Sequence, residues 1–580
     1  MKTKTINYDQ KPYKVIKTKE KCAWTGYENI IEELKSKIEG HKKTVFVIEC
    51  YPGVYQKEIL ENFKKLNPCL TINSDDCAMT PEELEELIKE DLTEDRVFGK
   101  MTTHSLSDYF KKDFLKEYKE KIETEKEGII LVYGVGASLI TEGDIFIYAD
   151  MPRWEIQLRY RKGMANWRSF NEDAPILTKY KRGYFAEWRW ADKHKKKIIK
   201  NIDYLLDTTQ EKKPSMVTSE AFFQALKQTA REPFRLVPYF DPGVWGGHWM
   251  KDNFGLTENK SNYAWSFDGV PEENSLRYQF GEVFLEIPAI DLVFLEARPL
   301  LGEKVHARFG DEFPIRFDLL DTIGGQNLSL QVHPLTEYIQ EKFNMHYTQD
   351  ESYYILDTQG EETFVYLGVQ ENVNKTAMEE DLYRAQNGEI IFEAEKYINK
   401  LPVKKHDHIS IPAGTIHCSG AGNMVLEISA TPYIFTFKLW DWQRTGLDGK
   451  PRPIHLEHGI QNIQWDRDTD WIYQNLYHQE KEIYQDEDKK IEQTGLHERE
   501  FIETFRHTVW TESTLETKGS VNMLNLVEGQ EATILSENNE FPPFTVHYAE
   551  TFIVPASVNK YKIRPAEGIE KVILIVARVK

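Results

Sequence analysis

The sequence predicts a multidomain protein in which an α/β domain with a parallel sheet precedes two all-β barrels. In residues 1–210, short apolar runs alternate with helix-like segments, the pattern of a parallel sheet covered on both faces. From about residue 280 onward, short strands follow one another at close spacing, as in a barrel or sandwich. Strands return near the C-terminus after a polar stretch. We therefore predict domains at 1–210, 217–460 and 495–580.

The N-terminal domain begins its sheet with the apolar strand TVFVIECYP at residues 44–52, and a run with helical periodicity follows it. A polar, proline-containing stretch at 207–216 is the expected linker to the next domain. Between them lie a second strand, LTINSDD, a helix, PEELEELIKEDL, with proline in its first turn, and two more apolar strands, GIILVYGVG and DIFIYADMP.

The turn after the first strand has the layout of a phosphate-binding loop. A working loop has the pattern GxxxxGK[ST], in which glycines let backbone amides surround the phosphates and the hydroxyl holds Mg²⁺. Here Tyr51 and Gln56 stand at the glycine positions and Glu58 replaces the hydroxyl residue, while Lys57 is retained. We predict a degenerate loop near Lys57 with no nucleotide-binding residues.

The segment DIFIYADMPRWEIQLRYRKG resembles the lid region of uridine- and pantothenate-type P-loop kinases. The resemblance implies that Arg153, Arg159 and Arg161 are its basic residues, and that Asp75 and Asp76 follow the second strand as acidic residues do there. The favoured interpretation is a kinase-like fold without nucleotide chemistry. An active kinase, or an unrelated α/β domain with a chance lysine, remains the alternative.

The β region is predicted from short apolar strands on either side of a polar segment. The segment 459–497 is rich in Gln and Glu, and we expect it to be connective. The strands after it predict a smaller barrel with a structural role, because it carries no set of metal ligands. The strands are EVFLEIP, LSLQVHP, ESYYILD, TFVYLGV, HISIPAG and NMVLEIS before it, and VNMLNLVEG, EATILS, ETFIVPAS, YKIRPA and KVILIVARV after it.

Two motifs, LSLQVHP and HISIPAGTIHC, match the metal-binding pattern of a cupin barrel. Alternate side chains of a strand share a face, so Gln331 and His333 project together. Glu351 opens a neighbouring aromatic strand, and the Pro-Ala-Gly turn leads to His417. Two imidazoles with two oxygens suit a divalent ion such as Zn²⁺. The nearby pair His406 and His408 is expected at the surface.

Collinear motifs from about Phe234 to the C-terminus resemble the class I mannose-6-phosphate isomerases. The resemblance implies that Gln331, His333, Glu351 and His417 are the ligands of one Zn²⁺ per chain. It also implies an aldose–ketose isomerase that interconverts mannose 6-phosphate and fructose 6-phosphate. The motifs are VPYFDPGVWGGHWMKDNFGL, NYAWSFDGVP, DEFPIRFDLLDT, LSLQVHP, ESYYIL, IPAGTIH, VLEIS and FKLWDWQRTGLDGKPRPIH.

The expected substrate shell departs from that family at two positions. In the segment TFKLWD, Lys438 stands where the family has an arginine. Two residues before Glu351, Gln349 stands where many members have a lysine. By the resemblance, Ser329 lies near the substrate phosphate and Glu427 lines the pocket as the candidate for proton transfer. Arg444, with Lys450 nearby, is the candidate for replacing the missing positive charge.

Composition excludes several classes of function. The formal charge of −21 disfavours a nucleic-acid partner. The five cysteines form no CxxC pair, no apolar signal peptide opens the chain, and no run is long enough to cross a bilayer. We therefore expect a soluble cytoplasmic protein, and the family resemblance implies a small phosphosugar substrate. The alternatives are a non-catalytic sugar-phosphate-binding protein that keeps the metal, and a bifunctional sugar kinase–isomerase.

Overall fold

The computed structural model describes residues 6–258, 260–360, 362–430, 434–446, 449, 451–495, 497–498 and 500–580. The chain divides into two compact units and passes between them more than once. Unit 1 comprises Met1–Pro12, Thr229–Asn274 and Glu296–Lys580, and unit 2 comprises Tyr13–Gln228 and Ser275–Leu295. The sequence-based boundaries do not include this exchange of segments.

Unit 2 contains a seven-stranded sheet of order β2-β8-β7-β6-β3-β5-β4. The strands from β4 to β7 are parallel, while β8 and β2 close one edge in antiparallel orientation. The central strand β3 is buried from Thr44 to Cys50, as expected of a strand covered on both faces. The largely parallel sheet is confirmed. Its strands are β2 (Ala23–Thr25), β3 (Lys43–Cys50), β4 (Leu70–Asn73), β5 (Gly128–Gly134), β6 (Ile145–Asp150), β7 (Tyr204–Asp207) and β8 (Ser215–Thr218).

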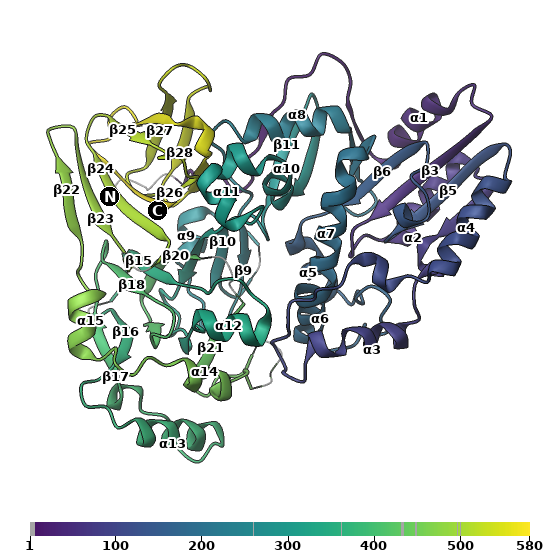
Figure 1. The fold of residues 1–580 in the computed structure, drawn as a ribbon. Helices are drawn as coiled ribbons and strands as arrows, with labels where there is room; N and C mark the ends of the chain where they lie inside the picture. The colour runs from purple at the N-terminus through teal and green to yellow at the C-terminus, as the bar shows by residue number, and fades with distance from the viewer. Residues whose placement is uncertain are drawn as a thin grey trace. The chain divides into compact units, whose positions relative to one another are not determined.

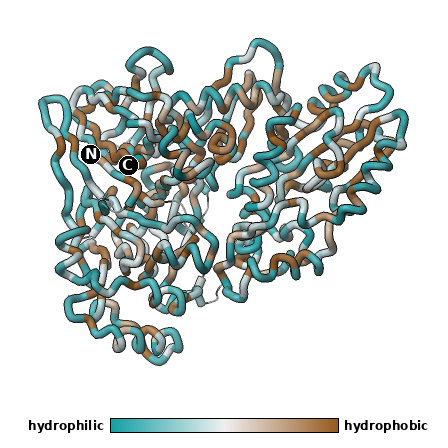
Figure 2. Tube along the Cα trace, viewed as in Figure 1, coloured by the Kyte–Doolittle hydropathy of each residue, from teal (hydrophilic) through white to brown (hydrophobic). Residues whose placement is uncertain are grey.

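Helices flank this sheet, and in Figure 2 its strands are mainly brown while the helices carry much teal. The segment 207–216 differs from the prediction: it is the connection between the antiparallel strands β7 and β8 and not an interdomain linker. A small sheet joins β1 (Lys14–Val15), β11 (Ser275–Phe280) and β12 (Val283–Pro288). The helices are α1 (Tyr27–Ile38), α2 (Gln56–Phe63), α3 (Pro81–Leu92), α4 (Lys112–Thr124), α5 (Arg153–Arg161), α6 (Ile176–Arg182), α7 (Trp188–Ile198) and α8 (Ser219–Thr229).

The first part of unit 1 is a pair of antiparallel sheets, labelled by their strands in Figure 1. The six-stranded sheet has the order β18-β15-β20-β13-β10-β9 and the five-stranded sheet the order β17-β16-β19-β14-β21. Their strands are β9 (Tyr239–Asp241), β10 (Trp265–Gly269), β13 (Ile315–Asp321), β14 (Leu330–Val332), β15 (Glu351–Thr358), β16 (Phe364–Val369), β17 (Ile398–Pro402), β18 (His408–Ile411), β19 (His417–Ser419), β20 (Asn423–Ala430) and β21 (Phe437–Trp440).

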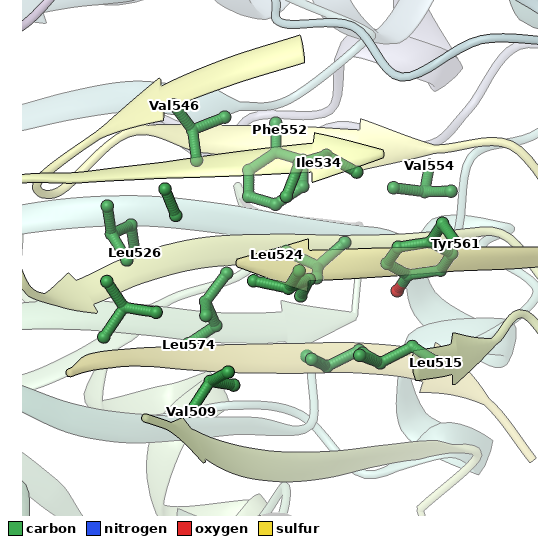
Figure 3. Packing of buried hydrophobic residues seen from close by; sticks show 14 of the residues in the cluster. Val509, Leu515, Leu524, Leu526, Ile534, Val546, Phe552, Val554, Tyr561 and Leu574 are labelled. Atoms are coloured by element: carbon green, nitrogen blue, oxygen red, sulfur yellow. The ribbon is translucent and has the colours of Figure 1, made fainter. Parts of the chain in front are cut away.

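The second part of unit 1 is another antiparallel pair, with the orders β22-β23-β24-β31-β26-β29 and β25-β30-β27-β28. Figure 3 shows its interior filled by apolar side chains that include Leu524, Phe552 and Leu574. The strands are β22 (Lys481–Gln485), β23 (Lys489–Thr494), β24 (Ile502–Val509), β25 (Ser513–Glu516), β26 (Asn522–Glu528), β27 (Glu531–Ser536), β28 (Phe544–His547), β29 (Thr551–Val554), β30 (Lys560–Pro565) and β31 (Val572–Val579).

The segment 459–497 is more ordered than the sequence predicts. It holds most of α14 (Leu456–Asn462), all of α15 (Thr469–Asn475) and the hairpin β22–β23, which extends the second six-stranded sheet. All five residues of β22 are exposed, so the strand has no alternation of apolar and polar residues to reveal it.

The remaining helices of the chain begin at Trp249, and no described helix combines the length and apolar character that crossing a bilayer requires. They are α9 (Trp249–Phe254), α10 (Ile290–Leu301), α11 (Glu303–Phe309), α12 (Thr336–Phe343) and α13 (Lys375–Gln386).

Candidate metal centre

Two histidines and a glutamate meet between the first two sheets of unit 1. His333 follows β14 directly, His417 begins β19, and Glu351 begins β15 in the opposite sheet. His333 Nε2 lies 3.0 Å from Glu351 Oε2, and His417 Nε2 lies 2.9 Å from Glu351 Oε1. All three side chains are buried, and their ligand atoms lie within 4.8 Å of one another. The structure thus brings together these three predicted residues in a group that could hold a metal ion.

The backbone fixes which nitrogen of each histidine faces the group. Nδ1 of His333 lies 3.1 Å from the carbonyl oxygen of Phe435, and Nδ1 of His417 lies 2.9 Å from that of Thr415. Because a carbonyl only accepts hydrogen bonds, each Nδ1 carries the proton and donates it. In the neutral ring, Nε2 then presents a lone pair to Glu351, which is the usual arrangement of a metal-bound histidine.

The donor set fits a cation. Within the described residues, His333 Nε2 and Glu351 Oε1 are buried without a hydrogen-bond partner. Lone pairs facing a carboxylate in a buried space repel one another unless a proton or a metal ion lies between them. Burial lowers the pKa of His333, but the facing Glu351 carboxylate outweighs this and leaves that pKa raised. A divalent ion would replace this proton, because metal binding requires the neutral imidazole.

Gln331 lies beside the group on β14, directly opposite His417 in the strand register. Its Nε2 is 3.1 Å from His417 Nε2, and its Oε1 accepts a hydrogen bond of 2.9 Å from Ser329 Oγ. The oxygen and nitrogen of a glutamine amide are assigned from such networks. Rotating the amide by half a turn places Oε1 toward the group, where it can serve as a ligand, and the Ser329 hydroxyl then accepts from the NH₂.

Glu427 lies on β20 next to the same group and is buried. The Gln349 amide nitrogen donates to Glu351 Oε2 over 2.8 Å and to Glu427 Oε1 over 3.3 Å, so it bridges the two carboxylates. Burial, and secondly the negative charge of Glu351, raise the pKa of Glu427 to about 7. A carboxyl group with this pKa can both accept and return a proton near neutral pH.

The basic residues predicted to contact the substrate differ in their position relative to His333, Glu351 and His417. Lys438 is directly opposite Gln331 on β21, and paired residues of neighbouring antiparallel strands project to the same face. Arg444 is held elsewhere: its Nη1 donates to the Asn327 carbonyl over 2.6 Å, and its Nε donates to Asp441 Oδ1 over 3.2 Å. The structure does not bring Arg444 to the histidines, and Lys450 is outside the described residues.

A charged pair on β13 was not among the site residues predicted from the sequence. Arg316 and Asp318 occupy alternate positions of the strand IRFDLLD, and both are buried beside Glu427. Charged residues on the inward face of a strand are rarely buried without a partner, so this alternation was a usable signal.

The expectation that His406 and His408 lie at the surface is wrong for His408. That ring is buried, and its nitrogens lie 2.9 Å from Thr494 Oγ1 and 2.9 Å from Ser352 Oγ. Burial lowers its pKa to about 3. His408 therefore contributes to packing and hydrogen bonding inside the unit.

The loop after β3 in unit 2 is bonded to side chains from other parts of the same unit. Tyr51 donates to Asp192 Oδ1 over 2.8 Å, and Arg159 donates to the carbonyl oxygen of Gly53 over 2.9 Å. Arg153 and Arg159 are buried in ion pairs, with Asp192 and with Glu155. A loop that binds phosphate presents amide N–H groups to the ligand, whereas here a carbonyl faces a fixed guanidinium.

Comparison with known proteins finds a family model and several relatives, each of which covers part of the chain. A family model described as a domain of unknown function, DUF8485, matches residues 26–231. The mannose-6-phosphate isomerase ManA of Bacillus subtilis is 29% identical over 235 residues, which are 40% of this chain and 68% of that protein. The mannose-6-phosphate isomerase of Streptococcus mutans is 25% identical over 232 residues, which are 40% and 67% of the two chains. The solved structure of the mannose 6-phosphate isomerase from Bacillus subtilis covers 60% of this chain and 100% of its own, with 21% identity and a TM-score of 0.49.

Proposed function

We propose that unit 1 is a zinc-dependent aldose–ketose isomerase that interconverts mannose 6-phosphate and fructose 6-phosphate. The observation that carries the proposal is the buried group of His333, Glu351 and His417, with the carboxylate of Glu427 beside it. Relatives named mannose-6-phosphate isomerase support the choice of substrate.

In this proposal Gln331, His333, Glu351 and His417 hold the zinc ion. When bound, zinc polarises the carbonyl and hydroxyl oxygens at the two reacting carbons of the sugar. The two Nδ1 hydrogen bonds to backbone carbonyls keep both rings oriented before the metal arrives.

The proton transfer is assigned to Glu427. Isomerisation removes a proton from one carbon and returns it to the neighbouring carbon, so a single base of suitable pKa can act twice. With its pKa raised to about 7, Glu427 can accept the proton in the first step and return it in the second. Ser329 and Lys438 are assigned to the substrate, and Arg444 supports the loop that carries Ser329.

A coupled assay for fructose 6-phosphate, started with mannose 6-phosphate and zinc-loaded protein, tests the function. A panel of hexose 6-phosphates in the same assay defines the preferred sugar. Absence of turnover with every sugar, together with stoichiometric zinc, would contradict the proposal. It would favour a non-catalytic sugar-phosphate-binding protein, for which the neutral amide of Gln349 between Glu351 and Glu427 is the supporting observation.

Removal of the metal should inactivate the protein reversibly. The proposed ligands are only oxygen and nitrogen atoms, and Gln331 is partly exposed, so chelators are expected to reach the ion. Dialysis against a chelator should abolish activity, and added Zn²⁺ should restore it, with metal content followed by elemental analysis. Full activity in protein shown to be metal-free would argue against metal dependence.

Lys438→Ala is expected to slow turnover strongly. The ammonium group is proposed to contact the substrate in a partly desolvated pocket, so its loss should cost about 2–4 kcal/mol of transition-state stabilisation. Lys438→Arg should be tolerated far better because it keeps the positive charge. Steady-state kinetics on mannose 6-phosphate measure both variants, and wild-type kcat/KM in the alanine variant would show that the side chain points away from the substrate.

We further propose that unit 2 is a degenerate P-loop kinase-like domain that transfers no phosphoryl group. Lys57→Ala should therefore leave isomerase turnover unchanged, because Tyr51 and Arg159 occupy the loop and Glu58 replaces the residue that would hold Mg²⁺. Kinetics of the full chain with and without ATP provide the measurement. An ATP-dependent phosphorylation that disappears in this variant would instead establish the bifunctional enzyme.

A further inference from the structure

Arg316 is a buried arginine that belongs to none of the recognised motifs. It lies on β13 with 3% of its surface exposed. Its Nε contacts Asp318 Oδ2 over 2.9 Å and donates to Ser429 Oγ over 3.0 Å, while its Nη2 contacts Glu427 Oε1. In the strand register Arg316 is opposite Ser429 and Asp318 is opposite Glu427. The four side chains therefore project from β13 and β20 to one interior face.

The contacts continue from this cluster to the metal-binding group. Glu427 Oε1 accepts hydrogen bonds from the guanidinium of Arg316 and from the amide of Gln349. The same amide also donates to Glu351. Arg316, Glu427, Gln349 and Glu351 thus form one connected path. A glutamate side chain has three rotatable bonds, and a guanidinium held on two sides restricts them to one orientation.

Several buried atoms around this path lack a partner within the described residues. They are Asp318 Oδ1, Gln349 Oε1 and the hydroxyl oxygen of Tyr353, in addition to the two atoms of the metal-binding group. Buried polar atoms are normally hydrogen-bonded, so a concentration of unpaired atoms indicates space that a ligand completes. Arg316 therefore contacts Glu427 next to unpaired polar groups, as expected beside a ligand site.

The charged and titratable groups that face Glu427 come from three segments. Arg316 and Asp318 lie on β13, Glu351 and Tyr353 lie on β15, and His333 follows β14. Burial raises the pKa of Asp318 well above its usual range, and Arg316 opposes this shift. One arginine between two carboxylates leaves a formal excess of one negative charge, which one proton on the pair neutralises.

We propose that Arg316 is a positioning residue that fixes the Glu427 carboxylate against Gln349, so that Glu427 faces the substrate carbons beside the metal. The inference rests on the proposed isomerase function for its kinetic consequence. The orientation that Arg316 gives to the Glu427 carboxylate does not depend on that function.

The chain offers a matched control in Arg235. This arginine is also buried in unit 1 between two carboxylates, with Nη1 2.6 Å from Glu550 Oε1 and Nη2 4.0 Å from Asp268 Oδ1. Within the described residues, its hydrogen bonds and ion pairs go to Asp9, Asp268, Glu550 and Thr551, none of which is a predicted metal ligand. A purely structural arginine should behave as Arg235 does, which separates positioning from stabilisation.

Arg316→Lys and Arg235→Lys are compared in the zinc-loaded full chain. For Arg316→Lys we expect unchanged zinc content, a fall in kcat on the order of 10- to 100-fold and a KM within about 3-fold of the wild type. The acid limb of the pH profile should move to higher pH, because lysine cannot bridge both carboxylates and stabilises ionised Glu427 less. Arg235→Lys should lower the thermal midpoint and leave kcat and the pH profile unchanged. Equal kinetic effects in both variants, or none in Arg316→Lys, would overturn the proposal.

Asp318→Asn gives a second test that does not depend on the folding of Arg316→Lys. Removing this negative charge leaves Arg316 paired with Glu427 alone, so the acid limb should move to lower pH, opposite to the shift in Arg316→Lys. A crystal structure of Arg316→Lys, or of Arg316→Gln if the former does not fold, should have the Glu427 carboxylate turned away from Gln349. If the Glu427 carboxylate does not move in this structure, the positioning role is refuted, whether or not the wild type is an active isomerase. If the wild type has no isomerase activity, only the proposed function is refuted.

Discussion

His333→Ala and His417→Ala are each expected to abolish zinc binding and isomerase activity. Each variant removes one of two nitrogen ligands and leaves Glu351 facing an empty space, so the remaining group has too few donors to retain the ion. We expect residual activity below about one thousandth of the wild-type value, since the polarisation supplied by the metal is lost entirely. Elemental analysis and the coupled assay measure the two effects on the same preparations.

The control for this experiment is His408→Gln. His408 is a buried histidine of the same sheets, but its nitrogens contact Thr494 and Ser352 and not the metal-binding group. This variant should keep stoichiometric zinc, although its thermal midpoint should fall. Zinc retained at full stoichiometry by both His333→Ala and His417→Ala would refute the ligand assignment.

Glu427→Gln is expected to reduce kcat by about 10²- to 10⁴-fold, the usual contribution of a positioned general base. The amide is nearly isosteric with the carboxylate but cannot accept a proton, so zinc content and KM should change little. Glu550→Gln is the control, because Glu550 is a buried carboxylate paired with Arg235 away from the group. It should lower stability without lowering kcat.

The same variant tests the pH dependence. The pKa of Glu427 is raised to about 7 by burial and by Glu351, and a bound divalent cation would lower it. Below its pKa the group is protonated and cannot act as a base, so the wild-type rate should fall as the pH falls through a midpoint at or below about 7. This acid limb should be absent in Glu427→Gln. An identical limb in the variant would assign the titration to another group.

Sequence motifs were sufficient to single out the three residues that the structure brings together, because each lies at a strand end and both histidines have a characteristic neighbour. His417 follows a Pro-Ala-Gly turn, and His333 precedes a proline. By contrast, the contact of Glu427 with Arg316 depends on the pairing of β13 with β20, across 111 residues of sequence. Register between distant strands cannot be deduced from the local pattern of either strand.

The fold classes were accessible from the sequence, but the division of the chain was not. The parallel sheet of unit 2 and the antiparallel sheets of unit 1 follow from runs of apolar residues with the expected spacing. The hairpin β22–β23 was missed because both strands are largely polar and β22 is fully exposed. The exchange of segments 1–12 and 275–295 could not be predicted, because changes of composition along the sequence delimit only continuous domains.

This exchange determines how the protein can be dissected experimentally. The N-terminal segment carries Tyr8, which donates to Asp268 over 2.5 Å, and Asp9, whose backbone N–H donates to Glu550 over 2.7 Å. A fragment that starts at residue 217 lacks these two donors, and one that stops at residue 210 lacks β8, β11 and β12. No single truncation of the chain gives a complete unit, because each unit consists of segments that are separate in the sequence. To express one unit alone, its segments must be joined by new linkers. Activities assigned to one unit are better separated by point substitution in the intact chain.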